Sequence, residues 1–568
     1  MRDKKEFYGI IESIDGADYR EYAKLIGDFD FARYVLKITH VQEDPESGPT
    51  LLVVRVPDVV AGFPPHLYNT AVRRTALEDY LSRRIAAHLE GGLEFDEHGI
   101  ARKRLFISAP GQKILPRTCL VVTDEFVEAR IYYNLPDRDG RIPGSELREV
   151  FFEELPMVVN ASLIFWNLDE REVEQAVDTM EDADEIRQML STRGLVAFVA
   201  EGSLLARGPD GETPLLENGE PLMVDDWAAQ QVEVTHSGKV RGLGIPTGIT
   251  VILGDEYSGR RELISAIASG IYNHPLGDGR EFAVSVPDTV YVCTDRGRAV
   301  QRVDLSPFFP GDASFSEYTT EHADDFVSQA AATVEAIEAG ARVLVFDESE
   351  SSAAFLMGDS RLHDLLPDSR VVALSQRARQ LADELGVSLV VGGGAAAMAF
   401  VPVADTVLRI HDNRVSDITA EAKKVVGDAA TGELEPDAVR RLGEIQRWVI
   451  PASIDASSGP HDAVIEAPEV HRLHFGRSEL SLGGLHQLAD AVQTATIGLI
   501  LYYLRVRYLD QPRPIRELLD LIDRDLSTEG LGCLTRDLRG DLARPRRYEI
   551  AGVINRLPSL RVRVGEPE

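Results

Sequence analysis

Lysine is scarce in this chain of 568 residues. Nine of its 60 basic residues are lysines and the rest are arginines, while 93 acidic residues bring the net charge to -33. This acidic excess disfavours a general attraction to nucleic acid or to anionic membranes. It suits a protein that stays soluble at high salt, and it leaves only local basic patches as candidates for binding polyanions.

The chain also has few cysteines and no long apolar run. Cys119, Cys293 and Cys533 are odd in number and far apart, which excludes a disulfide framework and the usual zinc spacings and favours a reducing compartment. No apolar run reaches the roughly 18 residues of a membrane-spanning helix. The N-terminus lacks the apolar core of a signal peptide. We therefore expect a cytoplasmic protein without membrane contact.

The middle of the chain alternates short apolar runs with helical patterns. The runs at 248–254, 341–348 and 387–394 predict strands, and residues 324–340 predict a helix between two of them. That order is typical of a mainly parallel α/β sheet with crossover helices.

The flanking regions differ from the middle in pattern. The N-terminal part mixes helices with strands, such as 50–57, and the turn-rich stretch 205–221 is a candidate boundary region. Residues 475–568 look largely helical. The last part of the chain, 501–568, has 13 arginines and no lysine against 11 acidic residues. This is a relatively basic end in a very acidic chain.

The segment TVILGDEYSGRRELI (250–264) has the outline of a phosphate-binding P-loop. Gly254 and Gly259 bracket four residues between a predicted strand and a predicted helix, as the wrapping of a phosphate chain requires. The lysine position, however, holds Arg260, and the magnesium-binding hydroxyl position holds Arg261. Arginine supplies charge but is bulkier than lysine and does not bind magnesium. By itself the segment is equally consistent with an ordinary strand, turn and helix.

A second motif follows about ninety residues later. The apolar strand ARVLVFDES (341–349) ends in Asp347 and Glu348. In ATPases this Walker B pattern places an aspartate at the magnesium shell and a glutamate at the attacking water. A strand that merely ends in an acidic loop is the alternative.

Distinctive stretches elsewhere carry a family resemblance over nearly the whole chain. They include IDGADYREYAKLIGDFDF (14–31), GQKILPRTCLVVTDEFVEAR (111–130), KVRGLGIPTGITVILG (239–254), VSQAAATVEAIEAGARVLVFDE (327–348) and GDLARPRRYEIAGVINRL (540–557). With them the chain resembles the predicted ABC-class ATPase family, soluble proteins with an ABC-type nucleotide domain. The resemblance implies an N-terminal α/β domain (1–235), an ABC-type P-loop domain (236–470) and a mainly helical C-terminal domain (471–568).

The resemblance also implies a homodimer that holds each ATP between the P-loop of one subunit and the signature segment of the other. In this sequence it points to Gly254, Tyr257, Ser258, Gly259, Arg260 and Arg261 on the P-loop, Ser328 and Gln329 on the signature segment, Asp347 at the metal and Glu348 at the catalytic water.

Three phosphate-facing elements depart from the family pattern. The loop G-G-G-Y-H-G-K-S-T of the family reads G-D-E-Y-S-G-R-R-E here, and the signature segment reads ADDFVSQA (323–330). Asp324 and Asp325 would bring carboxylates toward a γ-phosphate, at a cost of roughly 3 kcal/mol for like charges about 5 Å apart. The segment GGGAAAMAF (392–400) is less polar than expected. We therefore expect ATP binding with weak or lost hydrolysis, and an uncertain role for Mg²⁺.

A non-enzymatic function is the alternative. The chain would then be a pseudo-ATPase dimer scaffold that binds RNA or DNA through its arginine-rich end, with Arg544, Arg546 and Arg547 at the phosphates. Pairing of these arginines with carboxylates of the same chain is the competing interpretation.

Overall fold

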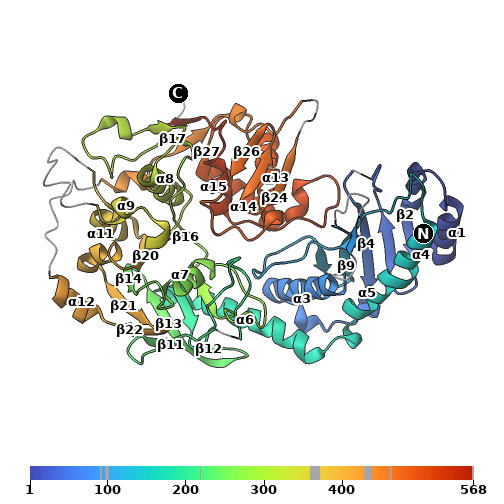
Figure 1. Cartoon of the computed structure of the whole chain (residues 1–568), viewed down its shortest axis with the longest axis horizontal. Coiled ribbons are helices and arrows are strands. Elements are labelled where there is room, and N and C mark those ends of the chain that lie inside the picture. The colour runs from blue at the N-terminus through green and yellow to red at the C-terminus, as the bar shows by residue number, and fades with distance from the viewer. Residues whose placement is uncertain are drawn as a thin grey trace. The chain divides into compact units, whose positions relative to one another are not determined.

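The chain folds into two compact units. The computed structural model describes residues 1–45, 47–89, 93–95, 101–217, 219–358, 371–427, 438–459, 461 and 463–565. The first unit comprises residues 1–181 and 531–544, and the second comprises 182–530 and 545–568 (Figure 1). The division falls inside helix α6 (Glu170–Thr192), so the turn-rich stretch 205–221 lies within the second unit.

The first unit is built on a seven-stranded sheet. Its strand order is β1 (Arg2–Asp3), β2 (Gly27–Asp30), β3 (Val35–Ile38), β4 (Thr50–Pro57), β9 (Phe126–Tyr133) and β7 (Leu105–Phe106), with β8 (Leu120–Val122) paired to β9. The longest pair, β4 and β9, is antiparallel, with Thr50 opposite Tyr133. The strand predicted at 50–57 is therefore present as β4. The helices of this unit are α1 (Lys4–Ile14), α2 (Asp58–Ala61), α3 (Ala71–Leu89), α4 (Gly144–Glu149) and α5 (Leu155–Ser162).

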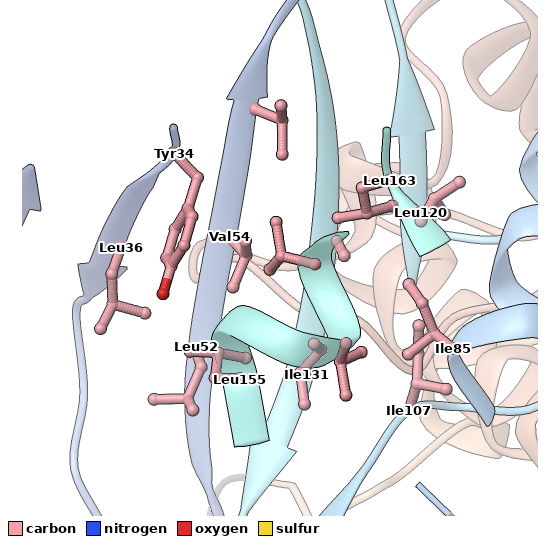
Figure 2. Close-up of a cluster of buried hydrophobic side chains, with 14 of the residues drawn as sticks. Tyr34, Leu36, Leu52, Val54, Ile85, Ile107, Leu120, Ile131, Leu155 and Leu163 are labelled. Carbon is pink, nitrogen blue, oxygen red and sulfur yellow. The ribbon is translucent and has the colours of Figure 1, made fainter. Parts of the chain in front are cut away.

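The core of the first unit lies between this sheet and its helices. Along β4, Leu52 and Val54 are fully buried and Val53 is nearly so, while Arg55 is exposed, so most of this strand is covered on both faces. Figure 2 shows these leucine and valine side chains beside Ile131 of β9 and Leu155 of α5. The apolar helix α5 therefore packs into this core.

The second unit is built on a mainly parallel sheet. Its strand order is β11 (Met223–Val224), β22 (Arg414–Asp417), β21 (Thr406–His411), β14 (Ile249–Leu253), β20 (Ser388–Gly393), β19 (Val343–Asp347) and β16 (Thr289–Tyr291). The five strands from β21 to β16 run parallel, which confirms the predicted sheet. Because β20 lies between β14 and β19, the carboxyl ends of these three strands meet at one edge.

Helices cover both faces of this sheet. They are α7 (Arg260–Ser269), α8 (Asp325–Glu338), α9 (Ala353–Met357), α11 (Leu374–Leu385) and α12 (Thr419–Val426). An antiparallel sheet of β12 (Ala229–Val234), β13 (Gly238–Pro246), β10 (Leu195–Ala200) and β15 (Ala283–Ser285) packs on the α7 side. Apolar side chains from α7, from the antiparallel sheet and from the mainly parallel sheet are buried together. The P-loop end of the sheet is therefore supported by a packed core.

The C-terminal part of the second unit combines helices with small sheets, so it is less helical than predicted. It contains α13 (Ala491–Arg507), α14 (Ile515–Thr528) and α15 (Arg547–Ile554), with small sheets formed by β23 (Arg447–Val449), β27 (Arg513–Pro514) and β28 (Val562–Val564) and by β24 (Ile465–Glu469), β25 (Arg472–Phe475) and β26 (Ser478–Ser481). Among the described residues, no helix combines the length and apolar character needed to cross a membrane.

Candidate nucleotide site

The P-loop (residues 254–261) joins β14 to α7 and is held by its own hydrogen bonds. Asp255 accepts a bond from the amide of Tyr257 at 3.1 Å through its carboxylate and one from the Ser258 hydroxyl at 2.8 Å through its carbonyl. Gly259 has φ 90°, and a Cβ there would collide with the Asn413 side chain. The Tyr257 side chain is 92% exposed. The turn is thus compact even without a phosphate.

Arg260 points into the protein along the carboxyl edge of the sheet. Its Nη1 donates to Asp347 Oδ1 at 2.8 Å and its Nε donates to the Gly254 carbonyl at 3.1 Å. The side chains of Arg260 and Asp347 are only 7% and 4% exposed. The residue at the lysine position is therefore in a buried ion pair with the Walker B aspartate.

A glycine of the intervening strand lies beside this pair. Arg260 has to pass β20 to reach Asp347 on β19, and Gly392 lies at the crossing point. A Cβ at Gly392 would lie 2.6 Å from Ile264 Cγ1 and 3.7 Å from Arg260 Nη1. A larger side chain would therefore displace the helix side chain that packs beside the guanidinium.

Asp347 has further partners besides Arg260. Its Oδ1 also accepts bonds from the Ser349 amide at 2.9 Å and the Ser349 hydroxyl at 2.8 Å. Charge-assisted bonds of this kind are stronger than neutral ones. The oxygen that would face a magnesium shell is thus shared by three donors of the protein.

Glu348 is held by the loop that follows β20. Its Oε2 accepts bonds from the amides of Gly394 at 2.6 Å and Ala396 at 3.1 Å. A Cβ at Gly393 would collide with the same carboxylate. The segment 392–400, which looks featureless in the sequence, therefore provides a backbone anchor for the predicted catalytic carboxylate.

Arg261 lies outside this buried network. Its Nη2 is 3.2 Å from Glu350 Oε1, and the two side chains are 44% and 40% exposed, so the pair adds little stability. Tyr291, at the end of β16, lies near Asp347 and Glu350. Burial raises the pKa of Tyr291, and the negative charges of Asp347 and Glu350 raise it further.

The predicted signature residues are fully buried on α8. The Ser328 hydroxyl accepts a bond from the Asp295 amide at 3.1 Å. The Gln329 side chain donates to Ser351 Oγ at 2.8 Å and accepts from the Ser352 amide at 2.9 Å. These bonds tie the start of α8 to the segment after Walker B, a connection that the sequence does not reveal.

Asp324 has a structural function in front of this helix. It is the N-cap of α8, and its carboxylate accepts a bond from the Val327 amide at 2.8 Å. Carboxylates at this position satisfy free amides and complement the helix dipole. The acidic signature segment therefore stabilises the helix that carries Ser328 and Gln329.

Buried ion pairs connect the other end of α8 to its surroundings. Glu335 pairs with Arg298 at 2.8 Å. Glu338 Oε2 accepts from Arg447 Nε at 2.9 Å, and Arg447 Nη2 also donates to Asn555 Oδ1 at 2.8 Å. Sequence reasoning missed these pairs. The available signal was two glutamates three residues apart on an otherwise mostly apolar stretch of helix.

The C-terminal arginines make contacts within their own units. Arg546 donates to the carbonyls of Pro287 and Thr289 at 2.8 and 2.9 Å and pairs with Glu549. Arg547 pairs with Asp520 at 2.8 Å. The Arg544 amide donates to the Pro116 carbonyl at 2.9 Å. For Arg546 and Arg547 the structure shows the intramolecular pairing that the sequence left open, and nucleic-acid binding stays a prediction.

An open hollow of about 470 Å³ lies beside the P-loop. Gly254 and Asp255 form one wall, and the β21–β22 hairpin contributes Arg409, His411 and Arg414. Arg414 pairs with Asp225 at 3.0 Å. The hollow gives a ligand access to the start of the P-loop.

The site fits an anion better than it fits magnesium. No side chain caps the N-terminus of α7, and free amides at a helix start favour phosphate. Magnesium requires carboxylate oxygens and waters in a strict octahedron, but Asp347 Oδ1 is already shared by three donors. A divalent cation about 4 Å from a guanidinium is repelled by about 8 kcal/mol at an effective dielectric constant near 20. The residues as arranged do not fit a magnesium ion.

Two family models of one class match consecutive parts of the chain. The model of an ABC-class P-loop ATPase domain matches residues 169–445, and the model described as "ATPase of the ABC class N-terminal" matches residues 5–165. This chain belongs to the ABC-class ATPase family. A third model, the MRB1590 C-terminal domain, matches residues 464–563 of this ABC-class ATPase.

Individual relatives of the ABC-class ATPase are distant. It is 29% identical over 192 residues to the uncharacterized protein MJ1628 of Methanocaldococcus jannaschii, which covers 30% of this chain and 41% of that protein. The chain thus matches less than half the length of this relative. A solved structure, cbiO1 of Clostridium perfringens from the ABC transporter complex cbiONQ, covers 44% of this chain and 95% of its own, with 16% identity and a TM-score of 0.24. A TM-score this low carries no argument.

Family membership supports nucleotide binding at a general level. P-loop ATPase domains of this class bind nucleotides, and the predicted ABC-type α/β fold is confirmed. The assignments of individual residues to ATP, metal and water stay predictions.

Proposed function

We propose that this ABC-class protein binds ATP at a paired site and hydrolyses it slowly or not at all. The observation that carries the proposal is the buried bond between Arg260 and Asp347. The side chain that occupies the lysine position therefore points to the Walker B aspartate. In an active P-loop the lysine at this position contacts the outer phosphates. Nucleotide binding is supported by family membership, the uncapped start of α7 and the open hollow beside the loop.

The assigned roles explain why turnover should be low. Glu348 would polarise water and Asp347 would orient the metal, but both carboxylates already accept bonds from the protein. Gly254, Tyr257, Ser258, Gly259 and Arg261 would contact the phosphates mainly through the backbone. Losing a single preorganised electrostatic group commonly costs about 10²–10³ in rate, so the loss of lysine and hydroxyl together leaves little catalysis.

Pairing of two chains would complete the site. Domains of the ABC type typically dimerise, and Ser328 and Gln329 of the second copy would then approach the first copy's phosphates. Both side chains are buried, so we expect the contact to be made by the start of α8 as a whole. Asp324 and Asp325 would make this approach weaker at low salt than at high salt.

The experiment is an ATP titration by calorimetry combined with a phosphate-release assay. We expect clear binding by the wild type and a turnover near background. The double variant Arg260→Lys, Arg261→Ser should raise turnover by about tenfold or more, because it restores the lysine and the hydroxyl. Adding Glu348→Gln to that variant should abolish the gain and leave binding intact.

The control is Arg302→Lys, which changes an exposed arginine paired with Glu317. It should change neither ATP binding nor turnover. A wild-type turnover of about 1 s⁻¹ or more, the lower end of ordinary enzymes, would contradict the loss of hydrolysis. Absence of ATP binding by the folded dimer at millimolar concentrations would contradict the proposed function as a whole.

A further inference from the structure

We infer that Arg260 is a built-in cation that takes the place of magnesium at Asp347, so that the P-loop accepts nucleotide as a metal-free polyphosphate. The part that concerns nucleotide rests on the proposed function. The part that concerns the metal does not, because it is a statement about Asp347 and its surroundings.

The guanidinium is fixed where a metal shell would have to form. Arg260 Nη1 lies 2.8 Å from Asp347 Oδ1, and Nε is bonded to the Gly254 carbonyl at 3.1 Å. A guanidinium stays protonated under all ordinary conditions, so this charge is permanent. In an ordinary P-loop the lysine meets the outer phosphates and a separate magnesium ion bridges them to Walker B. Here one side chain spans the distance from the P-loop to Walker B.

The surroundings of Arg260 favour this substitution. Its pair with Asp347 is buried, with 7% and 4% of the two side chains exposed. The second metal position, that of the P-loop hydroxyl, holds Arg261, which pairs with Glu350. The bonds to Asp347 and Gly254 use two of the five N–H donors of Arg260. The other donors are then available to phosphate oxygens at the end of the P-loop.

Iron-directed cleavage tests whether Arg260 excludes a metal ion from Asp347, because the cut positions show where the ion binds. Fe²⁺ occupies magnesium sites and, with ascorbate and peroxide, cuts the backbone beside its ligands, so the fragments identify the site even on a chain with 93 acidic residues. We expect no cut within residues 343–350 of the wild type. Arg260→Lys should release Asp347 and give cuts there, excess Mg²⁺ should suppress them, and Arg260→Lys with Asp347→Asn should lose them.

Arg260→Ala is the second variant in case the lysine variant folds poorly, and Arg302→Lys is the matched control. Equal cutting at 343–350 in wild type and variants would overturn the inference. So would the absence of cuts in both folded variants, because Asp347 would then not be a metal position that Arg260 blocks.

ATP titrations in EDTA and in Mg²⁺ test the nucleotide part. The two dissociation constants of the wild type should agree within about twofold, whereas Arg260→Lys should bind at least tenfold more tightly with Mg²⁺. Tenfold tighter binding by the wild type with Mg²⁺ would overturn the inference. Lack of any ATP binding would contradict the proposed function, while the cleavage result would still decide the role of Arg260.

Discussion

Replacing Arg260 with methionine is expected to lower the free energy of unfolding of the second unit by about 3–5 kcal/mol. This is the usual cost of removing one partner from a buried ion pair. Methionine keeps most of the side-chain volume but leaves the Asp347 carboxylate, only 4% exposed, without its cation. Denaturant unfolding at one fixed, high salt concentration measures the difference.

Two further variants make this measurement specific. Arg260→Met combined with Asp347→Asn should recover a large part of the loss, because the buried charge is removed together with its partner. Arg302→Met removes an exposed partner of Glu317, both about 40% exposed, and should cost less than about 1 kcal/mol. An Arg260→Met effect as small as that of Arg302→Met would contradict the buried pair.

Replacing Arg447 with methionine is expected to cost a similar 3–5 kcal/mol. Glu338 accepts bonds from both the amide and the Nε of Arg447, at 3.0 and 2.9 Å, and Asn555 Oδ1 accepts a third bond at 2.8 Å. Methionine keeps the backbone amide donor but removes the guanidinium, so the buried Glu338 carboxylate and the buried Asn555 side-chain amide lose their side-chain donors. Because Glu338 is on α8, the helix of the signature segment should lose protection from hydrogen exchange along with global stability.

Arg472→Met is the matched control for this second variant. Arg472 lies 3.4 Å from Glu479, and the pair is about half exposed, so its loss should be close to neutral. Protection of α8 that is unchanged in Arg447→Met would show that the C-terminal arginine does not stabilise the signature helix.

The sheet of the second unit could be predicted because buried parallel strands are continuous apolar runs. The runs at 248–254, 341–348 and 387–394 appear as β14, β19 and β20, and the helical patterns between them indicated parallel strands. The P-loop position followed from the spacing of Gly254 and Gly259. These features depend on local sequence, which is why they can be predicted without a structure.

The direction of Arg260 could not be predicted in the same way. It is decided by the buried bond to Asp347, which lies 87 residues away in the chain. Asp324 presents a similar case. From the sequence alone its carboxylate could either repel a phosphate or cap a helix. The bond that it accepts from the Val327 amide shows that it caps α8. Long-range contacts of single side chains decide what such residues do.

The first unit is completed by a segment that comes from almost the end of the chain. Residues 531–544 belong to it, although its main part ends at residue 181. Asp541 accepts a bond from the Tyr132 hydroxyl at 2.7 Å, and the Leu542 carbonyl accepts one from the Thr118 amide at 3.0 Å. At a synthesis rate of about 5–20 residues per second, the 349 residues between 181 and 531 take about 17–70 seconds to translate. The N-terminal unit therefore leaves the ribosome early but acquires its last segment only when almost the entire protein has been made.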